Sequence, residues 1–253
     1  MFTGIIESVA TLLQLEDRAD LRRIRLHLGK KFSRGLKLGA SVSVDGVCLT
    51  VVQINDQGAT DFEVIPETLH TTTLGKIRVG EELNVERASR EGAEIGGHPL
   101  SGHIDFCGKI RSLLKLENHY SLQIDVPPAW INYIFSKGYI ALNGASLTIH
   151  RVNKEESWFE VGLIPETLRR TTFTHKKRGD LINVEIDRHT QVIVDTVKST
   201  LMSLLNIHAS TITTSLAQKP VALLYKDAED ALKHSQHSLI LPSILDEEQR
   251  QNH

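Results

Sequence analysis

The sequence has few cysteines and no long apolar segment, and both absences limit what the protein can be. Cys48 and Cys107 are the only cysteines among 253 residues, which excludes a disulfide framework and predicts a reducing, cytoplasmic compartment. No apolar run approaches the ~20 residues that cross a bilayer, which argues against a membrane protein. The first residues lack a basic region followed by a long apolar stretch, so no signal peptide is expected.

The chain also lacks an excess of either charge. Charged residues make up 24% of it, the formal net charge is −2, and no basic stripe occurs, which argues against nucleic acid as the main partner. With 40% hydrophobic residues, the composition is that of an ordinary soluble chain with enough material for one or two cores.

Residues 1–87 and 99–187 are two copies of one pattern. Residues 45–50 (Asp-Gly-Val-Cys-Leu-Thr) match residues 143–148 (Asn-Gly-Ala-Ser-Leu-Thr) at an offset of 98, and Ile-Pro-Glu-Thr-Leu recurs at an offset of 99. A repeat of this length suits one small domain and is too long for a solenoid unit. The duplication therefore predicts two similar sites for two similar ligands.

Most of residues 1–187 have strand character. Ile24, Leu26 and Leu28 alternate with polar residues, and the same alternation recurs elsewhere, which places one face of each segment inward. Glycine, asparagine and aspartate punctuate these runs. Many short strands with regular turns predict closed or nearly closed β-barrels rather than a parallel α/β sheet.

Helical patterns occur at three places. The Pro-Pro pair at 127–128 predicts a helix through Ile134 that ends near Gly138. Residues 191–206 predict a helix with one apolar stripe, formed by Val194, Val197, Leu201, Leu204 and Leu205. That stripe either packs on its own barrel or joins other subunits, and the sequence leaves both interpretations open. Beyond it lie a Ser/Thr-rich stretch at 210–215, a candidate helix at 221–234 and a polar end at 246–253 that is expected to be disordered.

Several motifs together are characteristic of a known family. They are the opening Met-Phe-Thr-Gly-Ile-Ile-Glu, Gly-Val-Cys-Leu-Thr-Val, Ile-Gly-Gly-His-Pro-Leu-Ser-Gly-His-Ile-Asp at 95–105, Gly-Ala-Ser-Leu-Thr and the paired Pro-Glu-Thr-Leu. From Met1 to about Leu205 the chain closely resembles the riboflavin synthase family of the α-chain type. The resemblance implies an all-β fold with minor α content, in which two tandem six-stranded Greek-key barrels precede a C-terminal helix and an extra tail.

The resemblance also implies how the chain is divided. An N-terminal lumazine-binding barrel spans 1–97, a C-terminal lumazine-binding barrel 98–189, an oligomerisation helix 190–206, and an extension of unknown role 207–253. It implies a homotrimer joined by the helices, with each working site between the N-terminal barrel of one subunit and the C-terminal barrel of another. Whether lumazine synthase associates with the protein is left open.

The implied reaction is the dismutation of two molecules of 6,7-dimethyl-8-ribityllumazine. One molecule donates a four-carbon unit and becomes 5-amino-6-(D-ribitylamino)uracil, and the other accepts it and becomes riboflavin. The family uses neither metal nor organic cofactor, and the histidines of this sequence lack the spacing of a zinc site. The chemistry needs a base for the acidic C7 methyl of one lumazine, a polar group or nucleophile for the other ring, and two rings held face to face.

Differences between the two copies indicate the reactive residues. Cys48 aligns with Ser146, Ile5 with His103, and Ala88 with Asp187. Taken alone, a cysteine such as Cys48 is more often a buried structural thiol and a histidine such as His103 more often a hydrogen-bonded residue, while the position of Asp187 suits a helix N-cap. The resemblance favours active-site roles and predicts a catalytic set of Cys48, His103, Ser146, Asp187 and Ser41. His98 is interpreted as a structural residue that bridges the barrels, and Cys107 as structural.

The predicted substrate contacts are spread over both copies. By the resemblance they are Phe2, Gly4, Ile5, Thr50, Val64, Ile65, Glu67, Thr68, Gly102, Lys137, Thr148, Leu163, Ile164, Glu166 and Thr167. The two glutamates either hold ribityl hydroxyls or cap a turn. The polar groups are expected to form one half-site per barrel, with Ser41, Cys48, Thr50 and Thr68 in the first and His103, Ser146, Thr148 and Thr167 in the second.

Two other interpretations use the same barrel. A non-catalytic fluorescent antenna protein that binds lumazine or flavin would have lost polar residues in one or both barrels, whereas this chain keeps Cys48, Ser146 and His103. A barrel of the flavin-reductase type would need a nucleotide-binding α/β domain after it, and no Gly-rich strand-turn-helix follows. The sequence departs from the family at Asn143, where aspartate is common, and in the length of its tail.

Overall fold

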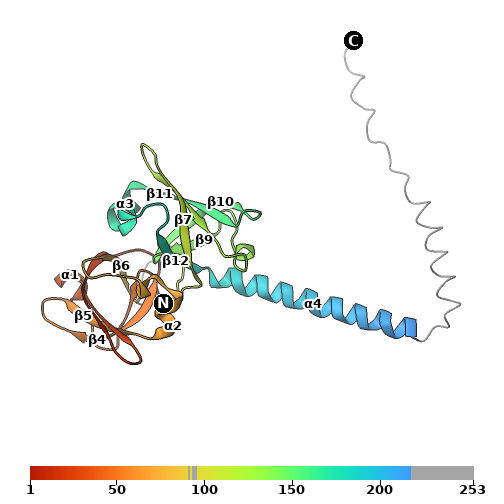
Figure 1. The fold of residues 1–253 in the computed structure, drawn as a ribbon, viewed down its shortest axis with the longest axis horizontal. Helices are drawn as coiled ribbons and strands as arrows, with labels where there is room; N and C mark the ends of the chain where they lie inside the picture. The colour runs from red at the N-terminus through yellow and green to blue at the C-terminus, as the bar shows by residue number, and fades with distance from the viewer. Residues whose placement is uncertain (91, 93–95, 218–253) are drawn as a thin grey trace, which may run out of the picture. The chain divides into compact units, whose positions relative to one another are not determined.

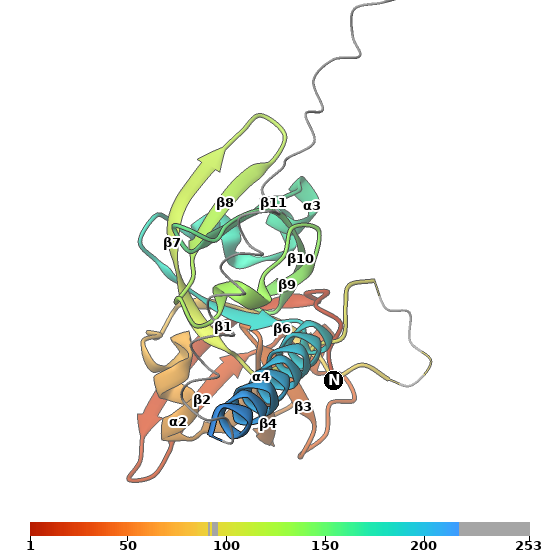
Figure 2. The same cartoon turned by 90° about the vertical axis from the view of Figure 1, so that its right-hand side faces the viewer.

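The computed structural model describes the backbone of residues 1–90, 92 and 96–217, and the side chains of these residues up to 205. Figures 1 and 2 show two barrels, the first red to orange and the second yellow-green to cyan. The first closes in the order β1-β2-β5-β4-β3-β6 and the second in the order β10-β11-β8-β7-β12-β9. This confirms the predicted pair of six-stranded barrels.

All strand pairs in both barrels are antiparallel. The first barrel consists of β1 (Ser8–Asp17), β2 (Arg22–His27), β3 (Ser41–Val44), β4 (Val47–Ile54), β5 (Ala59–Val64) and β6 (Glu82–Arg87). The second consists of β7 (Phe106–Lys115), β8 (Tyr120–Asp125), β9 (Tyr139–Leu142), β10 (Ala145–Asn153), β11 (Trp158–Leu163) and β12 (Leu181–Ile186). Short helices complete the fold: α1 (Lys30–Ser33), α2 (Pro66–Thr71), η1 (Thr73–Gly75), η2 (Ile131–Tyr133), α3 (Pro165–Arg170) and η3 (Thr172–His175).

Each barrel has its own apolar core. Ile24 and Leu26, which alternate with arginines along β2, are fully buried in the first core beside Phe62. Leu122 and Ile124 occupy the equivalent places in the second core. The period-two pattern read from the sequence therefore fixes which face of each strand points inward.

The two barrels meet through equivalent residues of the repeat. Gly46 and Gly144 face each other so closely that a Cβ on Gly46 would lie 2.8 Å from the backbone nitrogen of Gly144. The side chain of Asn84 donates to the carbonyl of Asn143 at 3.0 Å. The side chain of Asn183 donates in the same way to the carbonyl of Asp45 at 2.8 Å. This reciprocal bonding fixes the orientation of one barrel on the other.

Asp45 lies at the centre of this junction and is 2% exposed. Its carboxylate accepts from the backbone N–H of Asn84 at 2.8 Å and from the side-chain amide of Asn143 at 3.2 Å. An aspartate at position 143 would place a second buried acid opposite Asp45, so the amide avoids repulsion between like charges. Burial raises the pKa of Asp45 to about 7, although the charge of Lys176 and the Asn84 N–H act in the opposite direction.

We expect the ionisation of Asp45 to lower the free energy of unfolding as the pH rises. The unfolded chain releases this proton near pH 3.8 and the folded chain near 7, so the folded state binds more protons between these values. Relative to Asp45→Asn, the free energy of unfolding of the wild type should fall by roughly 2–4 kcal/mol from pH 4 to pH 7.5. Urea unfolding of both proteins across this range measures the difference, and a difference that does not change with pH would contradict the burial argument.

The long C-terminal helix differs in length from the sequence prediction. α4 runs from Arg188 to Ala217, whereas the sequence predicted a helix that ends at Asn206. No glycine or proline occurs between Gly179 and Pro220, and the Ser/Thr-rich stretch lowers helix propensity only mildly, so the helix continues. The predicted helix at 221–234 and the polar end at 246–253 lie outside the described residues.

The helix predicted after the Pro-Pro pair was wrong in length. Only the short helix η2 forms there. Its hydrogen bonds run to carbonyls three residues earlier, which is the 3₁₀ pattern, and they are donated by the N–H groups of Trp130, Tyr133 and Ile134. Ile131 and Ile134 are both buried in the second core, so packing selects the tighter turn. Among the described helices, none is both long enough and apolar enough to span a membrane.

Candidate functional site

In each barrel, two neighbouring strands continue beyond the ladder that joins them, and we call the residues beyond the ladder a slot. The ladder between β4 and β5 covers Val51 to Ile54, although β4 begins at Val47 and β5 continues to Val64. The ladder between β10 and β11 likewise begins at Ile149, four residues after the start of β10. We define the first slot as 47–50 with 63–65, and the second slot as 145–148 with 162–164. Both consist of residues that lie beyond the shared ladder.

Each slot is covered by a segment from the other repeat. The backbone N–H of Cys48 donates to the carbonyl of Gly102 at 2.9 Å, and that of Ser146 donates to the carbonyl of Gly4 at 2.9 Å. Gly4 and Gly102 have φ of +78° and +80°, and a Cβ on either would lie within 2.6 Å of the Cβ of Ser146 or Cys48. Glycine is therefore required at both positions for the chain to approach this closely.

Two buried glutamates hold these covering segments. Glu86 of β6 accepts from the backbone and side chain of Thr3 at 2.6 and 2.7 Å and from the Gly4 N–H at 3.0 Å. Glu185 of β12 makes the same three bonds to Ser101 and Gly102. Burial raises the pKa of both carboxyl groups, and the bonds they accept oppose that rise. Neither glutamate was predicted as a site residue from the sequence, although an Asn-Val-Glu motif shared by the two repeats marks them.

The first slot gathers the polar residues that the sequence predicted for the first barrel. Ser41 of β3 pairs with Thr50 of β4, which places their side chains on the same face as that of Cys48. Cys48 is half-buried against Phe2 and Ala88. The other predicted contacts surround the end of β5, with Val64 buried, Ile65 and Glu67 exposed and Thr68 half-buried.

His103 does not belong to the half-site that the sequence predicted for it. It follows Gly102 directly, so it lies on the segment that covers Cys48 in the first barrel. Its backbone is held there by Arg188, which donates to the His103 carbonyl at 2.8 Å. Ile5, its counterpart, lies on the segment that covers Ser146. The two segments cross between the barrels, and alignment of the repeats alone does not reveal this exchange.

The second slot contains a histidine–serine pair. Nδ1 of His98 lies 2.6 Å from Oγ of Ser146, while Nε2 is buried without a partner in the described residues. The His98 ring stacks on Tyr139, with ring centroids 5.1 Å apart and planes 15° apart. Burial lowers the pKa of His98, and the charge of Asp187 opposes this effect, so the imidazole is neutral at pH 7.

His98, which the sequence pattern indicated to be structural, lies beside the predicted catalytic residue Ser146. A Cβ on Gly97 would lie 2.8 Å from the Cβ of Ser146, so the backbone passes directly over this serine. His98 also donates its N–H to the carbonyl of Thr3 at 3.1 Å. The Gly-Gly-His sequence was the available signal, because two glycines before a histidine permit this close approach.

Asp187 caps α4 and also contributes charge to the second slot. Its carboxylate accepts from the backbone N–H and the hydroxyl of Thr190 at 2.9 and 2.8 Å. Burial alone would raise the pKa of Asp187, but the Thr190 bonds and nearby His189 lower it overall. The carboxylate is therefore ionised at neutral pH, and it is the charge that acts on His98.

The remaining predicted contacts belong to the second barrel. Lys137 is exposed, with a left-handed φ of 67°, and its N–H donates to the carbonyl of Ile149 at 2.8 Å. Thr148 and Ile164 are exposed, Leu163 is buried and Thr167 is half-buried. Glu166 forms ion pairs with Arg169 and Arg170 of its own short helix, so any ribityl hydroxyl must compete with these arginines.

No metal centre accompanies these slots in the described part of the chain, where no three His, Cys, Asp or Glu residues converge. Cys107 lies apart from both slots, with Sγ 3.4 Å from the carbonyl of Thr71 and 3.5 Å from the Asn183 side chain. Burial raises the pKa of the Cys107 thiol, which suits a structural cysteine.

Comparison with known proteins agrees with this architecture. The lumazine binding domain model matches twice, at residues 3–88 and 101–187. The riboflavin synthase of Escherichia coli is 42% identical over 202 residues, covering 79% of this chain and 93% of that protein. The riboflavin synthase of Chlamydia pneumoniae is 42% identical over 203 residues, covering 80% and 98%. This chain belongs to the riboflavin synthase family of lumazine-binding proteins.

Solved structures show the same fold at lower sequence similarity. LumP in complex with riboflavin matches with a TM-score of 0.69 and 23% identity, over 74% of this chain and all of that chain. LumP in complex with 6,7-dimethyl-8-(1'-D-ribityl) lumazine matches with a TM-score of 0.67 over the same shares. At this identity the similarity concerns the fold alone.

Proposed function

We propose that the chain is a riboflavin synthase, which converts two molecules of 6,7-dimethyl-8-ribityllumazine into riboflavin and 5-amino-6-(D-ribitylamino)uracil. The observation that carries this proposal is the pair of equivalent slots with different polar groups, Cys48 in one and His98–Ser146 in the other. A reaction between two identical molecules in different roles needs such a pair. Membership of the riboflavin synthase family supports it.

Each slot suits the edge of a flat heterocycle. The backbone around Val64-Ile65 and around Leu163-Ile164 lies beyond the barrel ladder, so it can exchange hydrogen bonds with the alternating donors and acceptors of a pyrimidine ring. Thr50 and Thr148 supply hydroxyls at the opposite wall of each slot. Glu67 and Glu166 begin the short helices after the slots and face the ribityl chains in this proposal.

The pair of His98 and Ser146 supplies the base in this proposal. A neutral imidazole in contact with a hydroxyl can accept a proton from the acidic C7 methyl of a lumazine, directly or through the serine. The Asp187 carboxylate then stabilises the imidazolium that forms. Cys48 and His103 act on the other lumazine, as a nucleophile or polar contact and as a ring contact. No step needs a metal or an organic cofactor.

The two rings meet between subunits of a homotrimer in this proposal. By the family resemblance, an N-terminal slot of one subunit faces a C-terminal slot of another. This arrangement holds the two rings face to face and so removes the entropic cost of bringing the two reactants together. The apolar stripe of α4 favours assembly, since Val197 and Leu201 remain 52% and 54% exposed. A cytoplasmic location follows from the scarcity of cysteine.

Truncation separates the role of the helix from that of the tail. A chain ending at Asn206 should stay trimeric and keep most of its turnover, because the family resemblance ends near Leu205. A chain ending at Thr190 lacks the stripe and should be monomeric and inactive, since each site would lose its second slot. Light scattering and a riboflavin assay check both variants. An active trimer without α4 would show that the stripe is not the assembly surface.

The antenna alternative has less support. Both slots keep their polar residues, and a protein that only binds a chromophore does not need the base that the His98–Ser146 pair supplies in this proposal.

A further inference from the structure

The two covering segments are held in different ways. We call residues 101–105, which lie over Cys48, the first cover, and residues 3–7, which lie over Ser146, the second cover. A buried glutamate binds each cover at its glycine N–H, so this part of the arrangement is the same in both repeats. The covers differ in the residue after the glycine, which is a histidine in the first and an isoleucine in the second.

Arg188, at the start of α4, binds the first cover at two points. Its guanidinium donates to the carbonyl of His103 at 2.8 Å and to the carboxylate of Asp105 at 3.0 Å. The Asp105 side chain is 4% exposed, so salt screens this ion pair less than an exposed one. The same carboxylate accepts the Ile186 N–H at 2.7 Å and the side-chain amide of Gln191 at 3.0 Å. The backbone that carries the His103 side chain is thereby tied to the first turn of α4.

The second cover lacks an equivalent of this arginine within the part of the chain that the structure describes. Glu7 occupies the position of Asp105 and accepts the Arg87 N–H at 2.8 Å, as Asp105 accepts that of Ile186. No described side chain, however, donates to the carbonyl of Ile5, which is the counterpart of His103. The additional anchor therefore accompanies the cover that carries an imidazole and not the cover that carries an alkyl group.

Helix stability gives no reason for a cation at position 188. Arg188 directly follows Asp187, whose carboxylate caps the helix, and the first turn of α4 contains no acidic residue. The positive end of the helix dipole disfavours a cation in the first turn. The reason for an arginine here therefore lies in its contacts with the first cover.

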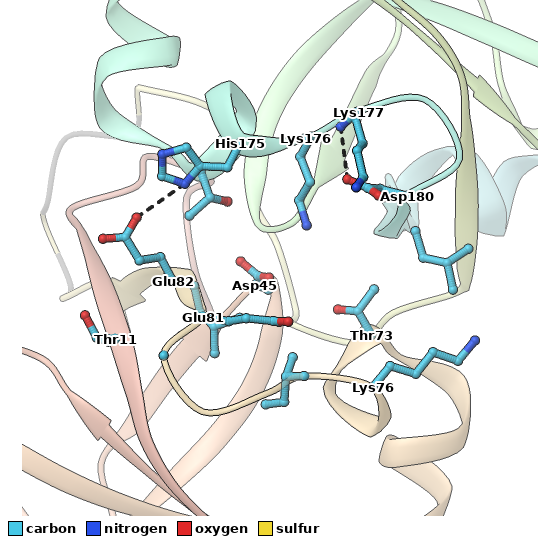
Figure 3. Close-up of a pocket in the computed structure, with 15 residues that line it drawn as sticks. Thr11, Asp45, Thr73, Lys76, Glu81, Glu82, His175, Lys176, Lys177 and Asp180 are labelled. Atoms are coloured by element: carbon cyan, nitrogen blue, oxygen red, sulfur yellow. Dashed lines mark hydrogen bonds and ion pairs between the residues drawn. The ribbon is translucent and has the colours of Figure 1, made fainter.

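The charged contacts at the barrel junction lie away from both covers. In the cavity between the barrels, Glu82 lies 3.4 Å from His175, and Asp180 accepts the Lys177 N–H at 3.0 Å (Figure 3). These contacts join one barrel to the other or fix a turn. They do not bind the backbone that carries His103, whereas Arg188 does.

We propose that Arg188 is a positioning residue, which holds the first cover so that the His103 imidazole meets the lumazine in the first slot. The inference rests on the proposed function and deepens it, because it adds a residue outside both slots to the machinery of the first. Arginine suits this task, since its planar guanidinium binds two acceptors in a fixed geometry, whereas the ammonium of lysine is a point charge on a flexible stem. Arg188 acts through the backbone of the cover and takes no part in proton transfer.

The test compares two substitutions of Arg188 in the full chain. Arg188→Met keeps the length of the side chain and removes its donors, and Arg188→Lys keeps the charge. Both are made with and without His103→Ala. Arg111→Met is the matched control, because Arg111 is also a partly exposed arginine that binds two carboxylates, those of Asp125 and Glu156, on the second barrel. Light scattering reports the assembly state of every variant.

Arg188→Met should lower kcat about tenfold while KM changes by no more than about twofold, and Arg188→Lys should keep an intermediate kcat. In the His103→Ala background, Arg188→Met should change the residual kcat by no more than about twofold, because the group that it positions is already missing. Arg111→Met should keep the wild-type kcat. An unchanged kcat in Arg188→Met, an equal loss with and without His103, or a change of assembly state would each overturn the proposal.

Amide hydrogen exchange tests the same anchor without turnover. The N–H groups of the first cover should exchange about tenfold faster in Arg188→Met than in the wild type, while those of the second cover should keep their rates. A wild type that makes no riboflavin would contradict the proposed function, and the exchange rates would still decide whether Arg188 holds the cover. Equal exchange of the first cover in both proteins would overturn the inference whatever the turnover.

Discussion

Ser146→Ala and Cys48→Ala should each lower turnover on the order of 10²-fold or more, with a much smaller effect on substrate binding. Each variant removes a group that acts on one of the two lumazines while the rest of its slot remains. Because these groups stabilise the transition state more than bound substrate, kcat should fall much more than KM rises. The control is Cys107→Ala, which removes the other thiol outside both slots and should keep wild-type turnover.

His98 provides a sharper test of the same chemistry. If His98 and Ser146 act as a unit, the double variant His98→Gln/Ser146→Ala should lose little more activity than Ser146→Ala alone. Burial lowers the pKa of His98 from its ordinary 6.5, so the wild-type rate should fall on the acid side of that value as the imidazole gains a proton. His98→Gln should lack this acid limb. Independent losses in the double variant, or an unchanged pH profile in His98→Gln, would leave His98 with a structural role.

Mixing two inactive variants should restore activity when their defects lie in different slots. In a mixed trimer, the intact first slot of a Ser146→Ala chain can face the intact second slot of a Cys48→Ala chain. With equal mixing, about a quarter of the interfaces should regain both intact slots. Co-refolding followed by a riboflavin assay measures the recovery, and native mass spectrometry confirms that mixed trimers form.

A control pair follows from the crossing of the covering segments. His103 lies with Cys48 on the first slot, so a mixture of Cys48→Ala and His103→Ala chains leaves every first slot with one defect. This mixture should stay inactive. Recovery in the control pair, or none in the test pair with mixed trimers present, would mean that the site does not span two subunits in the way proposed.

The barrels were predictable because their determinants are local and repeated. The alternation along β2 and the turn residues between strands predict short strands with one face directed inward. The internal duplication predicts that this barrel unit occurs twice. The positions of Cys48 and Ser146 on β4 and β10 follow from the same alignment. What repeats within one sequence can therefore be read from it.

Other features depend on contacts between segments that are far apart in the sequence, and such contacts cannot be predicted from the spacing of residues. His98 is 48 residues from Ser146 in sequence, and only the path of the chain over the second barrel brings their side chains together. His103 aligns with the second repeat but lies on the first barrel, because the segment that carries it crosses the junction. At residues 127–134, burial of two isoleucines overrode the helix that the prolines favour. In each case tertiary packing decided a question that local sequence left open.

The most direct test of the central claim is a single incubation. Full-length protein treated with EDTA is mixed with 6,7-dimethyl-8-ribityllumazine, and the products are separated by chromatography. The account predicts riboflavin and 5-amino-6-(D-ribitylamino)uracil in equal amounts, one of each for every two lumazines consumed, with no metal or cofactor added. Tight binding of the lumazine without any product would contradict it and would identify the chain as a chromophore-binding member of the family.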